Sequence, residues 1–490
     1  MSNLSTALSQ ALSGLRTSSG QSAIAARNIS RAGEEGYTRK YAGLTTDIDG
    51  SARIGSINRN AEKRLNDVLN SSISSSDAQK VHLQALEQLQ QTIGDVQDDT
   101  SIAWGINELQ NKLKLFEGNP ANGGLAAGVV SNAIGLVDSL HVASNTVQEV
   151  RVQADSGLKD SVANINTLLG QLQEINTYIR RAPESDEPYV EALDKRDAIL
   201  QKLSSEIGIR TIPQADNGIA VFTDGGVTLF NLTVRNVTFV PAAGLEPTVS
   251  GNAVYADGVA IAGPGAQMPP TKGKIAAYVG IRDSVAVTYQ SQLDEIARGL
   301  VIKFSEHDQS AFPVLPPATG LFSYSGAPAV PTVPGSASGL AANIAVSAAY
   351  DPSRGGNPML IRDGGRNGAS YLYNAQNSLG YQDRIGGLIA DLDQPMQFSP
   401  GSQLVALASV KQFAQGSAGW IEGLRSEASS KSEYLSAVTA RAKEALSNAT
   451  GVNVDEEMTE MLNLERSYQA SAKVINIIDQ MFSALLQAVR

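Results

Sequence analysis

The chain has 490 residues, of which 42% are hydrophobic and 18% charged, and its formal net charge is −11 at pH 7. The composition indicates a globular protein of roughly two to four domains and excludes a disordered polyelectrolyte. The absence of cysteine excludes disulfides, thiolate zinc sites and cysteine nucleophiles, and the negative charge opposes a phosphate backbone, so no nucleic-acid partner is expected.

The chain opens with a predicted helix that has one apolar face. Its apolar positions alternate spacings of four and three, which is the heptad pattern of a helix that packs against a partner helix. The positions of this face are Leu4, Leu8, Ala11, Leu15, Ser18, Ser22, Ala25 and Ile29, and its Ala and Ser residues allow a close approach of two backbones. The segment lacks the basic leader and continuous apolar block of a secretory signal, and no run approaches ~18 apolar residues, so neither a cleaved signal peptide nor membrane insertion is expected.

A turn follows this helix. Gly36 lets the chain bend sharply, Tyr37 offers a ring that can pack while its hydroxyl stays in water, and Arg39 can pair with an acidic neighbour. Residues 1–45 are therefore predicted to form an N-terminal helix and a hinge.

Proline maps the middle of the chain, because its ring breaks helix interiors. Of the 19 prolines, none precedes Pro120 and none follows Pro400, so the ends are predicted to be helical and the middle not. The fold class is α+β multidomain, with long terminal and bundled helices and inserted small β-rich domains. The predicted segments are a helical bundle at 46–208, an inserted β domain at 209–275, a helix returning to the bundle at 276–310, a Pro/Gly-rich mixed β and loop region at 311–400, and a second bundle part at 401–450.

Three local patterns support this division. A helix over about 188–207 is predicted to stop near Gly208, at a C-terminal cap position. Period-two alternation then flanks Asp224-Gly225-Gly226, which predicts a β hairpin. Leu293, Ile296 and Phe304 mark one face of the returning helix.

Residues 451–490 are predicted to form a C-terminal helix with a second heptad face. Its apolar positions are Met461, Leu464, Tyr468, Ile475, Ile478, Phe482, Leu485 and Val489. Three carboxylates at its start, Asp455, Glu456 and Glu457, favour simple helix capping over a contact role. Because each end is marginally stable alone, we expect both ends to become rigid only when the helices pair and pack on neighbouring subunits.

These residues resemble the flagellar axial proteins. The front of that family carries an Asn-Ile-[Ser/Ala]-Asn…Gly-Tyr-[Ser/Thr]-Arg segment, matched here by Asn28, Ile29, Ser30, Gly36, Tyr37, Thr38 and Arg39, with Arg31 at the usual Asn. The rear resembles the shared C-terminal segment at Gly451–Met458 and Tyr468–Ser471. Two internal segments, with Leu193, Asp194, Arg196 and Asp197, and with Gly273, Arg282, Asp283 and Asp294, resemble the hook-associated protein 1 family within that class. Independently of the resemblance, Asp194, Arg196 and Asp197 are interpreted as surface ion pairs of little energetic weight.

The resemblance implies a non-enzymatic structural component of the bacterial flagellum. It implies a junction adaptor between hook and filament that polymerises through antiparallel terminal helices forming an inner tube. The implied partners are the chain itself in a helical or ring assembly, the hook protein, a second hook-associated junction protein, and a cytosolic flagellar export chaperone at the C-terminal helix. Synthesis in the cytoplasm and type III export without a cleaved signal would then place the protein outside the cell.

Three alternatives remain open. The chain could be another axial protein of hook or rod type, or a surface-exposed adhesive protein, and an extracellular hydrolase in the Pro/Gly-rich middle is less favoured. His82, His141 and His307 fall in three different predicted helices without metal-site spacing. No catalytic, cofactor-binding or metal-ligating residue is therefore assigned.

Overall fold

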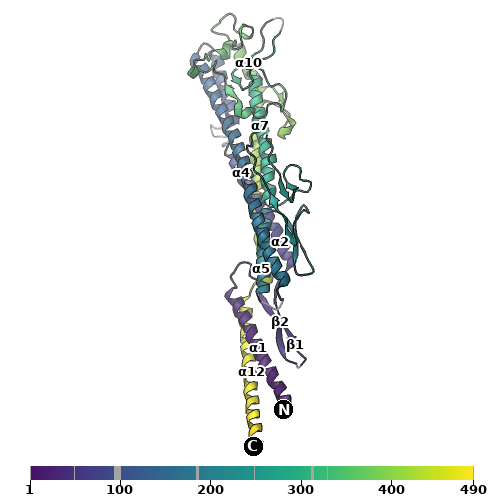
Figure 1. Cartoon of the computed structure of the whole chain (residues 1–490). Coiled ribbons are helices and arrows are strands. Elements are labelled where there is room, and N and C mark those ends of the chain that lie inside the picture. Colours follow the sequence, from purple (N-terminus) through teal and green to yellow (C-terminus); the bar gives the residue numbers. More distant parts are fainter. Residues whose placement is uncertain are drawn as a thin grey trace.

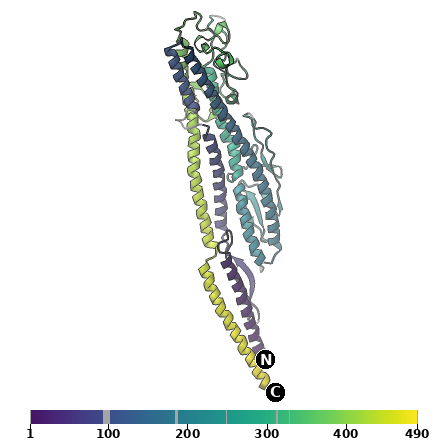
Figure 2. The ribbon, with the colours of Figure 1, turned by 90° about the vertical axis from the view of Figure 1, so that its left-hand side faces the viewer.

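The computed structural model describes residues 2–48, 50–92, 101–183, 187–247, 249–310, 314–327 and 329–488. The molecule is long and narrow, with both chain ends at one tip and the loops around α10 (Asp383–Asp393) at the other (Figures 1 and 2). The chain runs up and down this axis, so segments distant in sequence lie side by side.

The lower end consists of α1 (Ser2–Ser30) and α12 (Val454–Ala488), which lie side by side and run in opposite directions (Figures 1 and 2). A β hairpin of β1 (Lys40–Thr46) and β2 (Ala52–Arg59) packs against α1, where the hydroxyls of Ser13 and Thr17 both donate to the carbonyl of Ala52. Helices at both ends were expected from the heptad spacing. The hairpin was not.

The assignment of residues 46–59 to the helical bundle is therefore wrong. Lys40 pairs with Arg59 and Thr46 with Ala52 across an antiparallel register. Glycine permits the close approach of the strands, because a Cβ at Gly43 would lie 2.3 Å from the Ser56 hydroxyl. Strand pairing, which depends on the partner strand, overrides the weak local pattern of this segment.

The body is built from long helices that run along the axis. They are α2 (Lys63–Gln90), α3 (Ile102–Gly118), α4 (Gly123–Arg181), α5 (Glu187–Glu206) and α11 (Val410–Thr450). In Figure 2 α11 lies along α2, and the side-chain amide of Gln79 in α2 donates to the carbonyl of Ala428 in α11 at 3.2 Å. By length and composition α4 could also span a membrane; in this structure Leu140 and Leu158 are fully buried against neighbouring elements, whereas Val142 and Val152 are exposed.

The returning helix is present but interrupted. α6 (Lys274–Gly280) leads through a π-helical turn, Ile281–Val285, into α7 (Ala286–Lys303). Leu293, Ile296 and Phe304 are all buried, as their spacing predicts. Placing His307 in this helix is wrong, because the chain leaves the helix after Lys303.

Two small antiparallel sheets follow α5 and cover α4 and α5. The first has the order β3 (Ile209–Pro213), β4 (Ile219–Thr223), β5 (Thr228–Asn231), β6 (Thr233–Val234), and the second the order β7 (Val237–Thr238), β8 (Val254–Ala256), β9 (Val259–Ala262). The predicted hairpin is confirmed, since β4 and β5 pair around a turn in which Gly226 has a φ of 97°. A shared core joins these sheets to Leu158 and Leu203.

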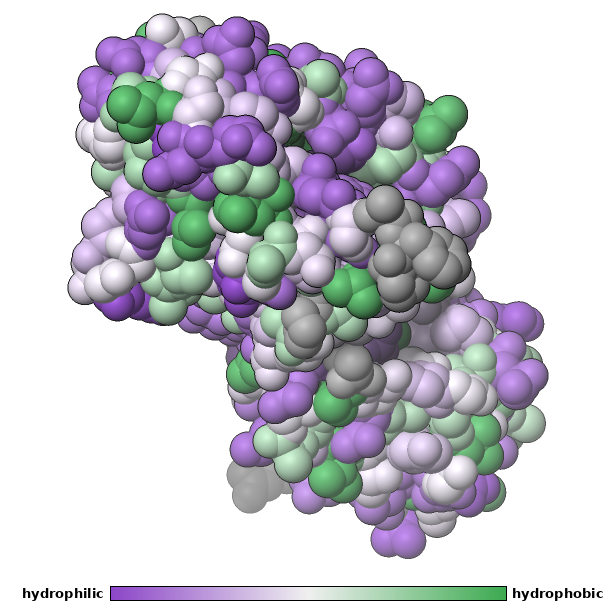
Figure 3. Space-filling model, turned by 90° about the horizontal axis from the view of Figure 1, so that it is seen from above, coloured by the Kyte–Doolittle hydropathy of each residue, from purple (hydrophilic) through white to green (hydrophobic). Residues whose placement is uncertain are grey.

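Residues 314–400 cover the upper end. Within it β10 (Phe322–Ser323) pairs with β11 (Ala345–Val346), and β12 (Met396–Gln397) pairs with β13 (Leu407–Ala408), which lies just after the region. It also contains the short helices α8 (Leu340–Asn343) and α9 (Leu360–Asp363). The mixed β and loop prediction missed α10, which buries Ile385, Leu388 and Leu392. Seen from above, this end presents mainly hydrophilic side chains with scattered hydrophobic ones (Figure 3).

Candidate functional site

The terminal helices contact each other through small and polar side chains. A Cβ added to Gly14 would lie 3.3 Å from the Ser471 hydroxyl, and the Ser18 hydroxyl donates to that of Ser467 at 3.2 Å. Further along, the amide of Asn28 reaches Glu457. Successive partners move up α1 and down α12, so the pair is antiparallel and in one constant register.

The predicted apolar positions lie on and beside this contact. Ala11, Leu464 and Ile478 are buried, and seven others are half-buried: Leu4, Leu8, Leu15, Ile29, Met461, Ile475 and Phe482. Tyr468 and Leu485 are each 43% exposed, and Val489 lies outside the described residues. The apolar spacing therefore identifies the face of α12 that contacts α1, but only part of the face of α1 that contacts α12.

Small positions of α1 make the contact, and Ser18 is one of the seam positions that the sequence predicts. Gly14, Ser18 and Asn28 make the closest contacts, because a small side chain lets two backbones approach. Their spacing of four and ten residues continues the heptad period, so the signal was present in serine and glycine rather than in leucine.

A second apolar stripe on α12 has no partner helix among the described residues. Val474, Ile477, Met481 and Leu485 are between 43% and 55% exposed. Their spacings of three, four and four place them on one face of the helix. This stripe borders the face that carries Ile475 and Ile478.

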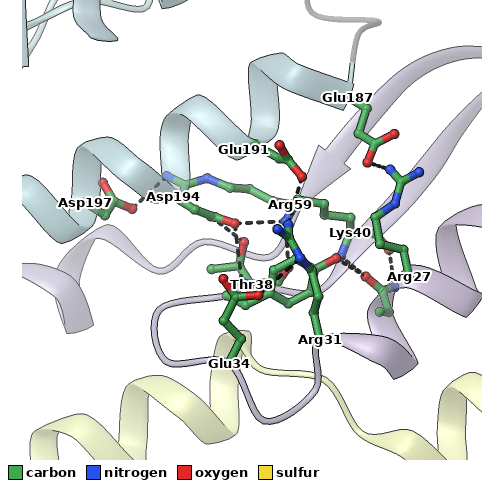
Figure 4. A network of polar contacts seen from close by, with 12 residues as sticks. Arg27, Arg31, Glu34, Thr38, Lys40, Arg59, Glu187, Glu191, Asp194 and Asp197 are labelled. Carbon is green, nitrogen blue, oxygen red and sulfur yellow. Dashed lines mark hydrogen bonds and ion pairs between the residues drawn. The ribbon is translucent and has the colours of Figure 1, made fainter.

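A polar junction connects the helix pair to the body. We use this name for Asn28, Tyr37, Thr38, Arg39, Lys40, Arg59, Asp194, Asp197 and Glu457. Figure 4 shows how α1, the hairpin and α5 bring much of it together.

Asn28 is the centre of the junction on α1. Its side chain is buried and donates to the Lys40 carbonyl at 2.8 Å and to Glu457 at 2.9 Å. Its oxygen accepts the Lys40 amide at 3.1 Å and the Tyr37 hydroxyl at 3.0 Å. One carboxamide thereby uses its full bonding capacity to join α1, the turn, β1 and α12.

The turn itself follows the prediction in part. Gly36 has a φ of 81°, which favours glycine. The Tyr37 ring lies 3.5 Å from the Lys40 ammonium, but its hydroxyl bonds Asn28 rather than water, and burial raises the pKa of Tyr37 to about 12. Arg39 pairs with an acidic residue as expected, Glu457.

The interpretation of Asp455, Glu456 and Glu457 as simple caps is wrong for Glu457. Its side chain is 2% exposed and accepts from both Arg39 and Asn28. The cap is Asn453, whose side chain accepts the backbone amides of Asp455 and Glu456. Glu457 is thus committed to a long-range contact that the sequence pattern does not reveal.

The surface ion-pair interpretation is also wrong for Asp194. Its carboxylate accepts from the Thr38 hydroxyl at 2.7 Å, from Arg59 at 2.7 Å and from Lys40 at 2.9 Å. The Lys40 side chain is 2% exposed, and burial lowers the pKa of Lys40 despite this bond. Asp197 binds the other end of the Arg59 guanidinium at 2.8 Å.

Arg196 departs from the same interpretation in another way. Its guanidinium donates to the carbonyl of Asn217 at 2.8 Å, and burial lowers its pKa. The three residues of the motif therefore have different roles, and two of them secure the base of the hairpin to α5.

Exposed pairs surround this buried centre. Arg31 binds Glu191 at 2.8 Å, Arg27 binds Glu187, and Lys443 of α11 binds Glu35 at 2.6 Å. An open cleft of about 920 Å³ lies beside the turn, between α2, α5 and the α11–α12 connection. Solvent-exposed pairs contribute little each, so we assign the coupling of the helix pair to the body to the buried bonds.

The described residues contain no group of three or more His, Asp or Glu side chains placed to hold a metal ion. His82 lies in α2, where burial lowers its pKa, and His141 in α4 bonds the carbonyl of Ile344 at 2.8 Å.

Comparison with known proteins agrees with this organisation. Residues 86–314 match the family model of the flagellar hook-associated protein FlgK helical domain, and residues 445–488 match that of the flagellar basal body rod FlgEFG protein C-terminal segment. Flagellar hook-associated protein 1 of Bacillus subtilis (strain 168) is 21% identical over 95% of this chain and 94% of its own length.

A solved structure, that of the flagellar hook junction protein FlgK from Burkholderia pseudomallei, is 22% identical and superposes with a TM-score of 0.42. The superposition covers 53% of this chain and about half, 47%, of that structure. With a match to the FlgK helical domain in its body and a match to the rod-type C-terminal segment over α12, the chain resembles flagellar hook-associated protein 1, a structural protein of the bacterial flagellum.

Proposed function

We propose that this protein is the adaptor between hook and filament and that it polymerises through its paired terminal helices. In this assembly α1 and α12 form the inner tube. Residues 60–208 and 401–450 form a middle layer, and the segments 209–275 and 311–400 face outward. The contacts between copies are head-to-tail, as a ring or helical tube requires.

The observation that carries the proposal is the stripe Val474, Ile477, Met481 and Leu485. One face of α12 is already used by α1, and this second apolar face remains exposed. Four large hydrophobic side chains in a row on a thin projecting helix are costly in water, and because each is already about half buried, full burial recovers roughly 0.7 to 1.5 kcal/mol for each. A neighbouring copy that presents its own helix pair covers them.

The partners and the route follow from the same proposal. The hook protein lies on one side of the ring, and a second hook-associated junction protein on the other. Before export a cytosolic chaperone covers the exposed stripe of α12 as a helix-in-groove complex. The protein is exported through the flagellar type III apparatus and acts outside the cell without a cleaved signal.

The test is performed in cells that produce the full chain. Replacing Ile477 and Met481 together by serine removes the centre of the stripe and leaves the face toward α1 intact. We expect the variant to be made and folded but absent from flagella, with filament subunits released into the medium. Replacing Val142 and Val152, which are exposed on α4, by serine is the matched control, and this variant is expected to give flagella of normal composition.

Localisation separates this function from the alternatives. An epitope-tagged chain imaged by electron microscopy is expected as one band at the hook-filament boundary. Labelling along the whole hook would instead identify a hook-type axial protein, and labelling of the cell surface an adhesive protein. Normal flagella and motility in the stripe variant would refute polymerisation through this face.

A further inference from the structure

The tip of the β1–β2 hairpin presents an isolated hydrophobic side chain. Ile48 is fully exposed, at 110% of its reference area, more than any other large hydrophobic residue of the described chain. Asp47 precedes it and is half exposed, at 3.2 Å from Arg53. Ile48 therefore makes no packing contact within its own chain and is available to another copy.

The tip is far from the body. The hairpin is secured to α5 at its base, where Lys40 and Arg59 bind Asp194, and β1 then runs to Thr46. At ~3.3 Å per residue the strand carries the tip roughly 20 Å from that base. Figure 1 shows the hairpin extending from α5 toward the chain ends, so Ile48 cannot reach the helices of its own body.

A shallow groove of about 520 Å³ lies between α4 and α5. Its floor is apolar, formed by Ile175, Tyr178, Ala198 and Ile199. Lys195 and Lys202 lie on its border, and neither forms an ion pair with another described residue.

The groove and the tip are complementary. An apolar floor bordered by two exposed lysines suits a short hydrophobic side chain next to a carboxylate, and the tip presents Ile48 next to Asp47. Glu174 is the one carboxylate among the groove's lining residues, and it would repel Asp47. The two lysines outnumber it, so the lining has a net positive charge.

We propose that the hairpin tip of one copy docks in the α4–α5 groove of a neighbouring copy, with Ile48 on the apolar floor and Asp47 facing Lys195 and Lys202. The inference rests on the proposed function, because it requires copies held side by side. The two surfaces are different, so the contact is heterologous and adds a link from each subunit to the next. It ties the body of one subunit to the base of another, outside the tube of terminal helices.

Disulfide trapping tests the contact directly, because the chain has no cysteine. The full chain carrying both Ile48→Cys and Ile199→Cys is produced in cells, flagella are isolated and oxidised, and the protein is separated without reductant. We expect dimers and higher multimers that reductant removes. Each single variant alone, and Ile48→Cys combined with Val152→Cys on another part of α4, give monomer.

Charge reversal gives a measure that does not depend on thiols. Lys195→Glu with Lys202→Glu is expected to lower the amount of chain in flagella by roughly tenfold or more. Adding Asp47→Lys restores it, whereas Lys159→Glu, an exposed lysine elsewhere on α4, has no effect. Failure of Asp47→Lys to restore incorporation contradicts the pairing.

The outcomes separate this inference from the proposed function. Cysteine variants that enter flagella without forming multimers overturn the docking and leave the junction role intact. Absence of the unaltered chain from flagella overturns both. Trapped multimers together with the charge rescue establish the contact.

Discussion

Replacing Asp194 by asparagine should detach the hairpin from the body without unfolding the body. The carboxylate binds Lys40 at 2.9 Å and Arg59 at 2.7 Å, and Thr38 keeps one hydrogen bond to the amide oxygen. Arg59 retains Asp197, but Lys40, 2% exposed, loses its ion pair. Leaving one buried charge without its partner costs about 3 to 5 kcal/mol. We take the lower figure because Arg59 and Thr38 keep hydrogen-bond partners in the variant. Opening of the hairpin then becomes roughly 100-fold more frequent.

Amide hydrogen exchange is the assay, because unfolding of an elongated, multidomain chain need not be two-state. In the Asp194→Asn variant the amides of β1 and β2 should exchange about 100-fold faster, while those of α4 are unchanged. Adding Lys40→Met removes the uncompensated cation and should recover most of the protection. Glu422→Gln, which breaks an exposed pair with Arg425, is the control and should have no effect. Unchanged exchange in β1 and β2 of Asp194→Asn would refute the role assigned to the junction.

The remaining predictions concern single positions. Burial raises the pKa of Asp294 from 3.8 to about 6, so the folded chain binds this proton more tightly than the unfolded chain does. The shift contributes at most about 3 kcal/mol to the free energy of unfolding. This contribution is complete below pH 3.8 and is lost as the pH rises through 6. Urea denaturation between pH 4 and 8 should show this dependence, flattened in Asp294→Asn. Gly36→Ala, at a φ of 81°, should cost about 1 to 2 kcal/mol and speed exchange in the turn, whereas Gly33→Ala, which meets no atom within 4 Å and has an ordinary φ, should not. Ser409→Ala removes the capping box of α11 and should lower helix stability by about 1 kcal/mol, measured by exchange of the first-turn amides.

Part of the fold could be predicted because its signal is local. The heptad spacing identified helices at both ends, and Asp224-Gly225-Gly226 identified the turn between β4 and β5. The end of α5 also fell where the pattern placed it, at Glu206 before Gly208. In each case the deciding residues lie within one or two turns of each other, so their spacing alone reports the structure.

Some local signals were present but were outweighed. Ile385, Leu388 and Leu392 have helical spacing and are buried on one face of α10, yet the many prolines around them favoured a loop prediction. The hairpin at 40–59 was missed for a different reason. Its apolar residues Tyr41, Leu44 and Ile48 are exposed, so no alternation of buried and exposed positions marks the strands.

Sequence by itself determined the helical ends, the β-rich insertion and the family to which the motifs belong. Tertiary structure decided the use of the charged residues: that Glu457 pairs with Arg39, that Asp194 receives Lys40 and Arg59, and that Asn28 joins both. The partners of Asp194 lie more than 130 residues from it, and those of Glu457 more than 400 residues. The energy of an ion pair depends on its burial and on its distance, and neither exists until the chain has brought the two groups together.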